Sequence, residues 1–521
     1  MGKKMENGKW KMENKLVLSI RRNLHRSLIF AALIFTFAWL LSPSAVWVHA
    51  QESPPAPSAP RAVSVPAIKE KKLPNGLTVA VAERKNVPLV TVQLLIRSGA
   101  ALEDLEKAGL ANMTAGLLTK GTKTRTATDI AEQMEFLGGS INTGADWNKT
   151  VVTISVMSDK LESAMAIMAD VVQNPAFKQS EIDLLKSQTL DSLTYNLKQP
   201  GFLANYAAAK YSFDEHPAGG TPESLKSINR VDLLKYKKEF YDLSSSILIF
   251  TGDVSSVKAV SLARKYFRIA APPRTEIIQR MDESPQTAVD NQPKEILTPK
   301  RLLVIDLPNS GQSAVSYSKY IENGRVDLNE SRSNADYFPA NVLNSILGGG
   351  YSSRLNQEIR IKRGLSYGAG SSFAWRYLNG NFSTRTQTKN ESAAEVAELV
   401  LAEVKKLGET SAAAGELVSR KSVLTGNFGR SLETNEGLAA AIADLYSFDL
   451  PASELNSYTK MVQNVTDAQV RGFAKRNLNG GDIIIVGDYA KFRDDLAKRF
   501  PNMKIDVIKA DELDLSKENL R

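Results

Sequence analysis

Two short stretches decide the fold: ILIFTGD at residues 247–253 and IIIVGD at residues 483–488. Each is an apolar run typical of a buried strand and ends in a Gly-Asp turn signal. A helix pattern precedes each strand, VDLLKYKKEFY or TDAQVRGFAKRNL, and its aspartate lies 21 residues before the turn aspartate. A helical stretch follows each turn and ends in a phenylalanine, Phe267 or Phe500. Because helix, strand, turn and helix match in order, the chain contains an internal repeat.

The repeat extends into the middle of each half. The strand pattern TVVTISVMS and the strand pattern NFSTRTQT are each followed by an amphipathic helix, ESAMAIMADVVQNPAF or ESAAEVAELVLAEVKKL. We therefore expect an α+β fold of two homologous halves, each an antiparallel sheet with helices packed on one face. The expected boundaries are an N-terminal half at 69–271, a polar, Pro-containing linker at 272–293, a C-terminal half at 294–510 and a polar tail at 511–521.

The first 50 residues indicate an export signal. A basic stretch runs to Arg26, an apolar run spans 28–41, and small residues, Val48 and Ala50, precede Gln51. The apolar run is shorter than the roughly 20 residues that a bilayer span needs. Residues 51–68, rich in Pro, Ala and Ser, then suggest an extended tether. We expect an exported protein in the periplasm of a Gram-negative bacterium, held at the membrane only if the leader stays uncleaved.

Composition excludes several kinds of site. The chain has no cysteine, so it has neither disulfides nor thiolate metal ligands. Two of its three histidines, His25 and His49, lie in the leader, so only His216 remains in the mature chain. The leader also carries eight Lys/Arg and two Asp/Glu, which accounts for most of the net charge of +9. The mature chain is therefore nearly balanced and has no general electrostatic affinity for nucleic acid.

The helical stretch GLANMTAGLLTKGT, residues 109–122, resembles the pitrilysin/insulinase family of zinc peptidases. That family carries His-x-x-Glu-His here: histidines at i and i+4 share a helix face and bind one zinc, and the glutamate acts as general base. In this sequence the two ligand positions hold Asn112 and Gly116, and the base position holds Ala115. The family's third ligand falls near Ser192, with Asp191 beside it. The resemblance thus implies that this chain binds no zinc at that place; a metal site rebuilt from Asp191 and other carboxylates is the alternative.

A lone histidine follows in the stretch DEHP, residues 214–217. The stretch resembles a His-Pro loop of the same family, which stabilises a turn. His216 has no evident catalytic partners in the sequence, so we interpret it as structural.

The second half carries a glycine-rich loop, LGGGYSSRL, that leads into a short helix pattern and then IKRGLSY. This arrangement resembles the family's C-terminal signature, in which an arginine and a tyrosine seven residues apart face the zinc site. Here they are Arg360 and Tyr367. The resemblance implies that Tyr367 donates to the developing oxyanion and that Arg360 holds a substrate carbonyl or orients the tyrosine. It also implies a substrate-binding loop at Gly348, Gly349 and Gly350.

Each of these residues also has a simpler interpretation. An arginine at the end of a helix is often a solvated partner of the helix dipole, a tyrosine in a strand is often packing, and glycines often mark a turn. Arg354, in the same loop, we interpret as structural.

The resemblance covers nearly all of residues 70–505. It also implies that the two parts of the active site lie on different chains. Some bacterial members place zinc on one chain and the arginine–tyrosine pair on another. We therefore expect the zinc-free subunit of an exported heterodimeric metalloendopeptidase, inactive alone, whose homologous partner supplies Zn²⁺ and whose substrate is an unfolded peptide. The alternatives are a non-catalytic structural or peptide-binding subunit of the same fold, and an independent periplasmic peptide-binding protein.

Overall fold

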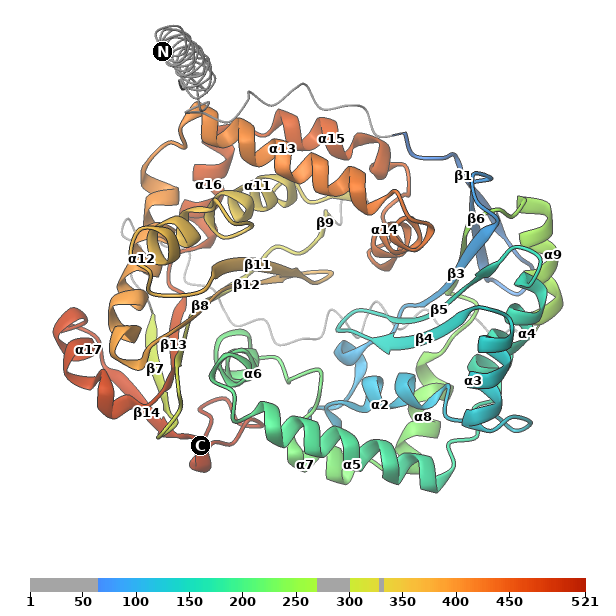
Figure 1. Ribbon diagram of the computed structural model, residues 1–521, viewed down its shortest axis with the longest axis horizontal. Helices are drawn as coiled ribbons and strands as arrows, with labels where there is room; N and C mark the ends of the chain where they lie inside the picture. Colours follow the sequence, from blue (N-terminus) through green and yellow to red (C-terminus); the bar gives the residue numbers. More distant parts are fainter. Residues whose placement is uncertain (1–63, 269–299, 328–331) are drawn as a thin grey trace, which may run out of the picture. The chain divides into compact units, whose positions relative to one another are not determined.

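The two repeated strands are central strands of two six-stranded sheets (Figure 1). They are β6 (Ile247–Gly252) and β13 (Asp482–Gly487), and every residue of both is buried. The computed structural model describes residues 64–268, 300–327 and 332–521, all within one compact unit. The predicted leader, most of the predicted tether and the predicted linker at 272–293 lie outside the described residues.

The first sheet contains six strands from the N-terminal half. In spatial order they are β1 (Ile68–Lys72), β2 (Thr78–Glu83), β6, β3 (Leu89–Ile96), β5 (Thr150–Met157) and β4 (Ser140–Ala145).

The second sheet repeats this order with strands of the C-terminal half, and a two-stranded ribbon of β9 (Val326–Asp327) and β10 (Arg332–Ser333) accompanies it. In the order that corresponds to the first sheet, its strands are β14 (Ile505–Lys509), β7 (Arg301–Asp306), β13, β8 (Ser313–Ile321), β12 (Gly380–Thr388) and β11 (Ala369–Trp375).

The α+β fold of two related halves is confirmed, but the sheets are mixed rather than purely antiparallel. Strand β6 lies between β2 and β3 and pairs parallel with β2 and antiparallel with β3. In the second half, β13 is likewise parallel to β7 and antiparallel to β8. Because neighbouring strands of the chain run in opposite directions, a strand inserted between them must be parallel to one of the two.

The edge strand next to β2 or β7 does not follow the repeat. In the first sheet it is β1, which precedes β2 in the chain and pairs antiparallel with it. In the second sheet it is β14, which comes from the end of the chain and pairs parallel with β7. The last residues, predicted as a polar tail, follow β14 and include Leu515 and Leu520, both buried against the second sheet.

The predicted helices of the repeat are present in both halves. The amphipathic helices are α4 (Leu161–Gln173) and α12 (Ala393–Glu409), and α9 (Ser256–Tyr266) and α17 (Arg493–Arg499) both end just before the predicted phenylalanines. The other helices of the first half are η1 (Ala100–Leu102), η2 (Leu105–Lys107), α2 (Leu110–Leu117), α3 (Ala127–Phe136), α5 (Gln179–Asn196), α6 (Pro200–Phe213), α7 (Pro222–Ser227) and α8 (Arg230–Phe240). Those of the second half are α11 (Tyr337–Leu347), the π-helix η3 (Asn356–Ile361), η4 (Asn390–Ser392), α13 (Ala414–Ser431), α14 (Asn435–Ser447), α15 (Glu454–Asn464), α16 (Asp467–Asn477), η5 (Tyr489–Lys491) and η6 (Ala510–Glu512).

The aspartates that supported the repeat have different roles in helices α8 and α16. Asp232 is the third residue of α8 and closes a capping box with Asn229. Asp467 is the first residue of α16 and accepts from the Ala412 backbone N–H and from Arg471. The equal spacing of the two aspartates was therefore partly coincidental, although the helices themselves correspond.

Each half contributes one helix that packs on the sheet of the other half. This helix lies on the face opposite to the helices of that sheet's own half. Helix α6 packs on the second sheet, where Leu203 and Ala207 join Leu303 and Ile484 in one apolar cluster. Helix α14 packs on the first sheet in the same way, in a cluster that includes Leu438, Ile442 and Ile249. Helices thus lie on both faces of each sheet, which explains why β6 and β13 contain uninterrupted apolar runs, residues 247–250 and 483–486, instead of alternating.

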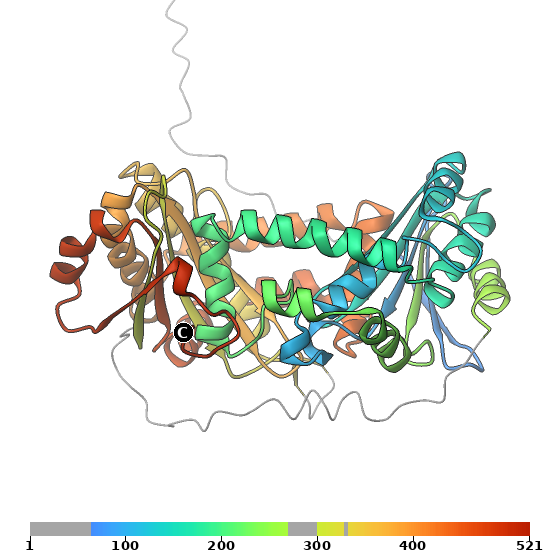
Figure 2. The ribbon, with the colours of Figure 1, turned by 90° about the horizontal axis from the view of Figure 1, so that it is seen from below.

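The turn between α5 and α6 directs α6 to the second sheet. Gln199 is extended and Pro200 is the first residue of α6, a position where proline is compatible with a helix start. Figure 2 shows the resulting sharp change of direction between the long α5 and the shorter α6. None of the helices in the described part of the chain is long and apolar enough to cross a membrane.

Candidate functional site

Helix α2 carries the positions at which the zinc peptidases that this sequence resembles hold their metal. Gly109, with φ of 93°, starts the helix in a left-handed conformation that suits glycine. The carboxylate of Glu103 accepts hydrogen bonds from the backbone N–H groups of Gly109 and Ala111, at 2.7 Å each. A carboxylate at a helix N-terminus satisfies free donors and is favoured by the helix dipole. Glu103 therefore fixes where α2 begins.

The three motif positions on α2 carry no histidine, thiolate or carboxylate, and none of them is exposed. The Asn112 side-chain amide donates to the Ala218 carbonyl at 2.8 Å, and Ala115 is fully buried. A Cβ atom on Gly116 would lie 3.3 Å from Leu185 Cδ2 of α5, which leaves little room for a larger side chain. The donor set therefore does not fit zinc, which prefers histidine nitrogen, thiolate or carboxylate ligands.

The predicted third position lies on α5, which packs against α2. Ser192 is exposed and accepts a 3.3 Å hydrogen bond from Asn196, and its neighbour Asp191 is exposed as well. No group of three or more His, Cys, Asp or Glu side chains that could hold a metal ion occurs within residues 64–268, 300–327 and 332–521. The alternative of a rebuilt carboxylate site around Asp191 thus receives no support from the described residues.

His216 is buried beside α2. Its Nε2 atom lies 3.0 Å from Glu103 Oε1, and its ring lies 4.9 Å from the ring of Trp147. The histidine therefore contacts the carboxylate that caps α2 rather than an open catalytic position.

A network that the sequence did not point to continues from His216 into the second half. Glu215 forms a two-pronged ion pair with Arg376, at 3.1 and 2.9 Å, and accepts from the Asn381 amide at 2.9 Å. The Arg376 guanidinium also lies 4.8 Å from the Trp147 ring. Arg376 follows β11 and Asn381 belongs to β12, so the β11–β12 hairpin holds the loop that carries His216. Glu215 stands beside His216 in the sequence, but only the fold shows that its partner is Arg376.

The glycine-rich loop follows α11 and depends on two of its three glycines. A Cβ atom on Gly348 would lie 2.1 Å from the Ser371 backbone nitrogen, and one on Gly349 would lie 2.8 Å from Ser345 Cα. A Cβ atom on Gly350 would have an ordinary contact with Arg420 Nη1, at 3.8 Å. Close approach of backbones thus requires glycine at the first two positions.

Helix α13 holds the rest of the loop. Arg420 donates to the Ser352 carbonyl, and Arg354 forms a two-pronged pair with Glu416 at 2.9 and 2.8 Å. The hydrogen bonds that Arg354 donates to the Glu416 carboxylate raise the pKa of the arginine. Arg354 is thus engaged in a structural ion pair, as we expected.

Arg360 and Tyr367 lie on the segment that follows this loop. Arg360 is half-buried in η3, with its guanidinium 5.0 Å from the ring centroid of Tyr351. Tyr367 is 89% exposed, just before β11. π-helical turns are rare and often occur at functional sites. The two predicted side chains do not hydrogen-bond to each other among the described residues, and Tyr367 presents a free phenol to its surroundings.

Comparison with known proteins agrees with this geometry. The insulinase (peptidase family M16) model matches residues 78–207, and the model described as the peptidase M16 inactive domain matches residues 227–424. The chain belongs to the insulinase family. It is a member without the zinc-binding residues.

Curated relatives include proteins described both as peptidases and as non-peptidases. An uncharacterized zinc protease of Rickettsia bellii is 28% identical over 65% of this chain and 77% of its own length. The non-peptidase homolog YmxG of Helicobacter pylori is 22% identical over 80% of this chain and 91% of its own.

Two solved structures share the fold. The peptidase M16 inactive domain from Pseudomonas fluorescens is 25% identical, with a TM-score of 0.68, and the match covers 81% of this chain and 98% of that one. A protease from Helicobacter pylori is 18% identical, with a TM-score of 0.70 over 81% of this chain and 100% of that one. The second likeness concerns the fold alone.

Proposed function

We propose that this insulinase-family chain is the zinc-free subunit of an exported heterodimeric metalloendopeptidase. The observation that carries the proposal is an asymmetry between the halves. In the first half, Asn112, Ala115 and Gly116 carry no group that would bind zinc or act as general base on a zinc-bound water. In the second half, the glycine-rich loop is intact and Tyr367 is 89% exposed. A side chain that completes a partner's site must be accessible, and Tyr367 meets this condition.

In the proposed complex the partner supplies Zn²⁺, which activates water and polarises the scissile carbonyl. This chain supplies polar groups from the second half. The Tyr367 hydroxyl donates to the carbonyl oxygen on which negative charge develops. The Arg360 guanidinium donates to a neighbouring peptide carbonyl.

Two of the four edge strands of the six-stranded sheets lie next to the segments of the candidate site, and an unfolded peptide would join a sheet at such an edge. β4 is an edge strand of the first sheet and β11 an edge strand of the second. β4 lies beside α2, because the Thr143 hydroxyl donates to the Ala115 carbonyl at 2.7 Å. Addition of a peptide strand at such an edge uses main-chain hydrogen bonds and is tolerant of sequence, which suits a peptidase of unfolded chains.

The test is reconstitution with a homologous subunit that carries His-x-x-Glu-His. The mixture is expected to cleave an unstructured peptide, and neither chain alone is expected to do so. Tyr367→Phe and Arg360→Ala are expected to lower kcat roughly 10²-fold, the usual effect of losing one oxyanion donor. Tyr195→Phe and Arg493→Ala serve as matched controls, because both residues are exposed and lie on other helices. Full activity of the Tyr367→Phe mixture would remove the catalytic role.

A non-catalytic role is the second candidate, favoured by the match to an inactive-domain model and by the non-peptidase relative. It predicts a stable complex, or peptide binding, without any zinc-dependent cleavage in the mixture.

A further inference from the structure

Arg420, on α13, is a buried cation without an acid beside its guanidinium. The residue is only 6% exposed, and within the described residues its guanidinium hydrogen-bonds to Ser352 alone, through Nη2. The Nε atom is buried and has no partner. Burial lowers the pKa of Arg420, and Glu416, one helical turn earlier, offsets this effect only in part. Because a buried charge without a partner lowers stability, a bound anion would stabilise this position.

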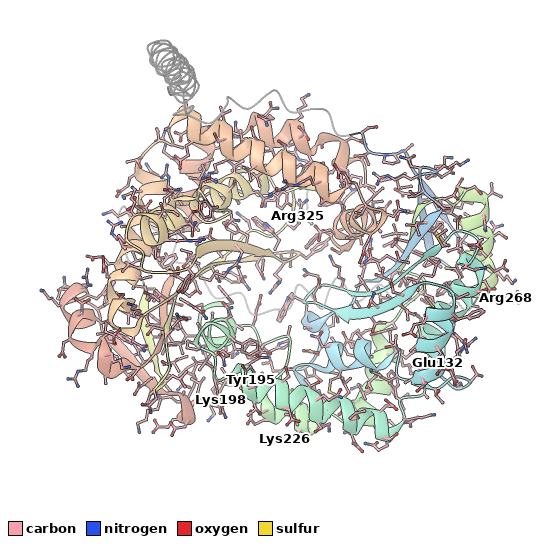
Figure 3. The ribbon with its side chains drawn as sticks, viewed as in Figure 1. Glu132, Tyr195, Lys198, Lys226, Arg268 and Arg325 are labelled. Atoms are coloured by element: carbon pink, nitrogen blue, oxygen red, sulfur yellow. The ribbon has the colours of Figure 1, made fainter. Side chains whose placement is uncertain are left out.

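Other poorly exposed arginines of this half do have an acid. Arg354 forms its two-pronged pair with Glu416, which is thereby engaged. Arg325, labelled in Figure 3, is the other arginine of the described core, and its guanidinium lies 3.9 Å from the Glu454 carboxylate. Arg420 is thus the exception.

The internal repeat shows that the fold does not require an arginine here. Helices α5 and α13 correspond: both have 18 residues, with glutamate third and lysine eighth. The two lysines, Lys186 and Lys421, each donate to a backbone carbonyl of a neighbouring segment. At the seventh position, however, α5 has Leu185 where α13 has Arg420. Since an apolar side chain suits this position in the first half, packing alone does not explain the charge in the second.

The glycine-rich loop leaves space beside this guanidinium. A Cβ atom on Gly350 would have Arg420 Nη1, at 3.8 Å, as its one neighbour within 4 Å beyond the adjacent residues. Nη1 donates to no acceptor of the described chain. Gly350, Tyr351 and Ser352 are exposed, and their backbone N–H groups have no acceptor within the described residues either. Free guanidinium and free backbone donors therefore occur together at this loop.

The acids next to the loop are already engaged. A pocket that borders Ser352 contains three carboxylates, each paired with a lysine or an arginine: Glu358, Glu403 and Glu416. A further cation, Arg385 of β12, is exposed and lies beside Gly370, which contacts the Gly348 carbonyl. The surroundings of the loop thus favour an anion from outside the described chain.

A carboxylate suits this arrangement. A guanidinium and backbone N–H groups are the donors that bind carboxylates most strongly in proteins. The loop also adjoins the candidate site, because the Tyr351 ring lies 5.0 Å from the Arg360 guanidinium. A peptide held by Arg360 would therefore pass close to Gly350.

From these observations we infer that Arg420 and loop residues 350–352 bind a carboxylate of a peptide, either an acidic side chain or the C-terminus. The carboxylate accepts from Arg420 Nη1 and from the free loop N–H groups. The inference rests on the proposed function, because it takes the ligand to be the peptide held at the Arg360–Tyr367 segment. It adds a substrate class, which is peptides that carry a negative charge near that segment.

The test measures peptide affinity by fluorescence anisotropy, with the chain from Gln51 onward, which contains every described residue. Three labelled, unstructured peptides are compared: one with a single glutamate and an amidated C-terminus, the same peptide with glutamine, and the glutamine peptide with a free C-terminal carboxylate. At least one peptide with a carboxylate is expected to bind roughly tenfold more tightly than the neutral peptide, as for a hydrogen bond to a charged group. Sodium acetate is expected to reduce this difference, compared with sodium chloride at the same ionic strength.

Two variants locate the site. Arg420→Met removes the guanidinium, and Gly350→Val keeps it but fills the space beside Nη1; each is expected to make the affinities for the three peptides equal. Arg430→Met is the control, since it removes the same charge from an exposed position of the same helix, and it is expected to keep the preference. Thermal melts check that all variants remain folded.

Equal affinity of the parent chain for all three peptides, or no binding of any of them, would overturn the inference. A preference that survives in both Arg420→Met and Gly350→Val would do the same, and competition by phosphate or sulfate but not by acetate would contradict the choice of a carboxylate. The reconstituted mixture separates the inference from the proposed function. Equal cleavage of acidic and neutral peptides would leave the peptidase function and remove the carboxylate site, whereas binding that depends on Arg420, without any cleavage, would do the reverse.

Discussion

The Nε2 atom of His216 lies 3.0 Å from Oε1 of Glu103, whose side chain is completely buried. The same carboxylate accepts from two backbone N–H groups at the start of α2. The one histidine among the described residues is thus used to hold the helix on which zinc peptidases of the insulinase family carry their ligands.

Replacing Glu103 is expected to loosen the start of α2. Glu103→Gln removes the charge, leaves one acceptor oxygen for three donors, and is expected to cost about 1–3 kcal/mol of stability. Hydrogen exchange of a peptide containing Gly109 and Ala111 is expected to become faster. Glu106→Gln, an exposed glutamate in the same segment, is the control and is expected to leave exchange unchanged.

The ion pair between Glu215 and Arg376 is expected to be an important contact between the halves. Its side chains are only 11% and 17% exposed, so Arg376→Ala leaves a carboxylate poorly solvated and is expected to cost about 3 kcal/mol. Urea unfolding, followed by tryptophan fluorescence, measures the loss.

A neutral double variant separates charge from packing at this pair. Arg376→Met with Glu215→Gln keeps an acceptor for Asn381 and is expected to recover more than half of the loss. A double variant as unstable as Arg376→Ala would contradict the role of the unpaired charge.

The glycine-rich loop offers a contrast between neighbouring positions. Gly348→Ala places a Cβ atom 2.1 Å from the Ser371 backbone nitrogen, so the loop and β11 must separate. This variant is expected to lower the melting temperature by several degrees, as a loss of about 2 kcal/mol does in a chain of this size, and to abolish activity in the reconstituted mixture. Gly350→Ala brings its Cβ atom no closer than 3.8 Å to a neighbour and is expected to leave the melting temperature unchanged; if both variants lower the melting temperature alike, the loop does not depend on close backbone contact.

Acid stability is expected to depend on Glu83. Hydrogen bonds from Lys69 and from the Ser256 backbone N–H lower the pKa of the Glu83 carboxyl from 4.5 to about 2. A carboxyl whose pKa is lower in the folded state stabilises the protein above its unfolded pKa, and that contribution is lost as pH falls through the folded pKa.

The measurement is thermal stability of the parent chain and Glu83→Gln as a function of pH. The parent is expected to be more stable near pH 6, and the difference is expected to vanish between about pH 4.5 and pH 2. Asp159→Asn, which removes an exposed acid at the same sheet end, is the control. A difference that persists unchanged to pH 2 would show that Glu83 does not act through its charge.

Local patterns predicted much of the architecture. The apolar runs of β6 and β13, the helix patterns of α4 and α12, and the phenylalanines that follow α9 and α17 were all visible in the sequence, because periodicity and turn residues act over a few neighbours. The glycine run was visible in the sequence as well, but its close approach to the Ser371 backbone was not. The predictions of an exported, partnered chain remain predictions.

The sequence by itself determined that the chain is a duplicated α+β protein and that it lacks the residues of a histidine-based zinc site, since composition and spacing are properties of the chain. Only the tertiary structure decided that α6 and α14 each cover the other half's sheet, that Arg376 pairs with Glu215, and that His216 supports Glu103. These contacts join residues far apart in sequence, and no local pattern specifies which apolar or charged partner comes to lie opposite another. The small number of histidines can be counted in the sequence, whereas the contact of His216 with Glu103 depends on the fold.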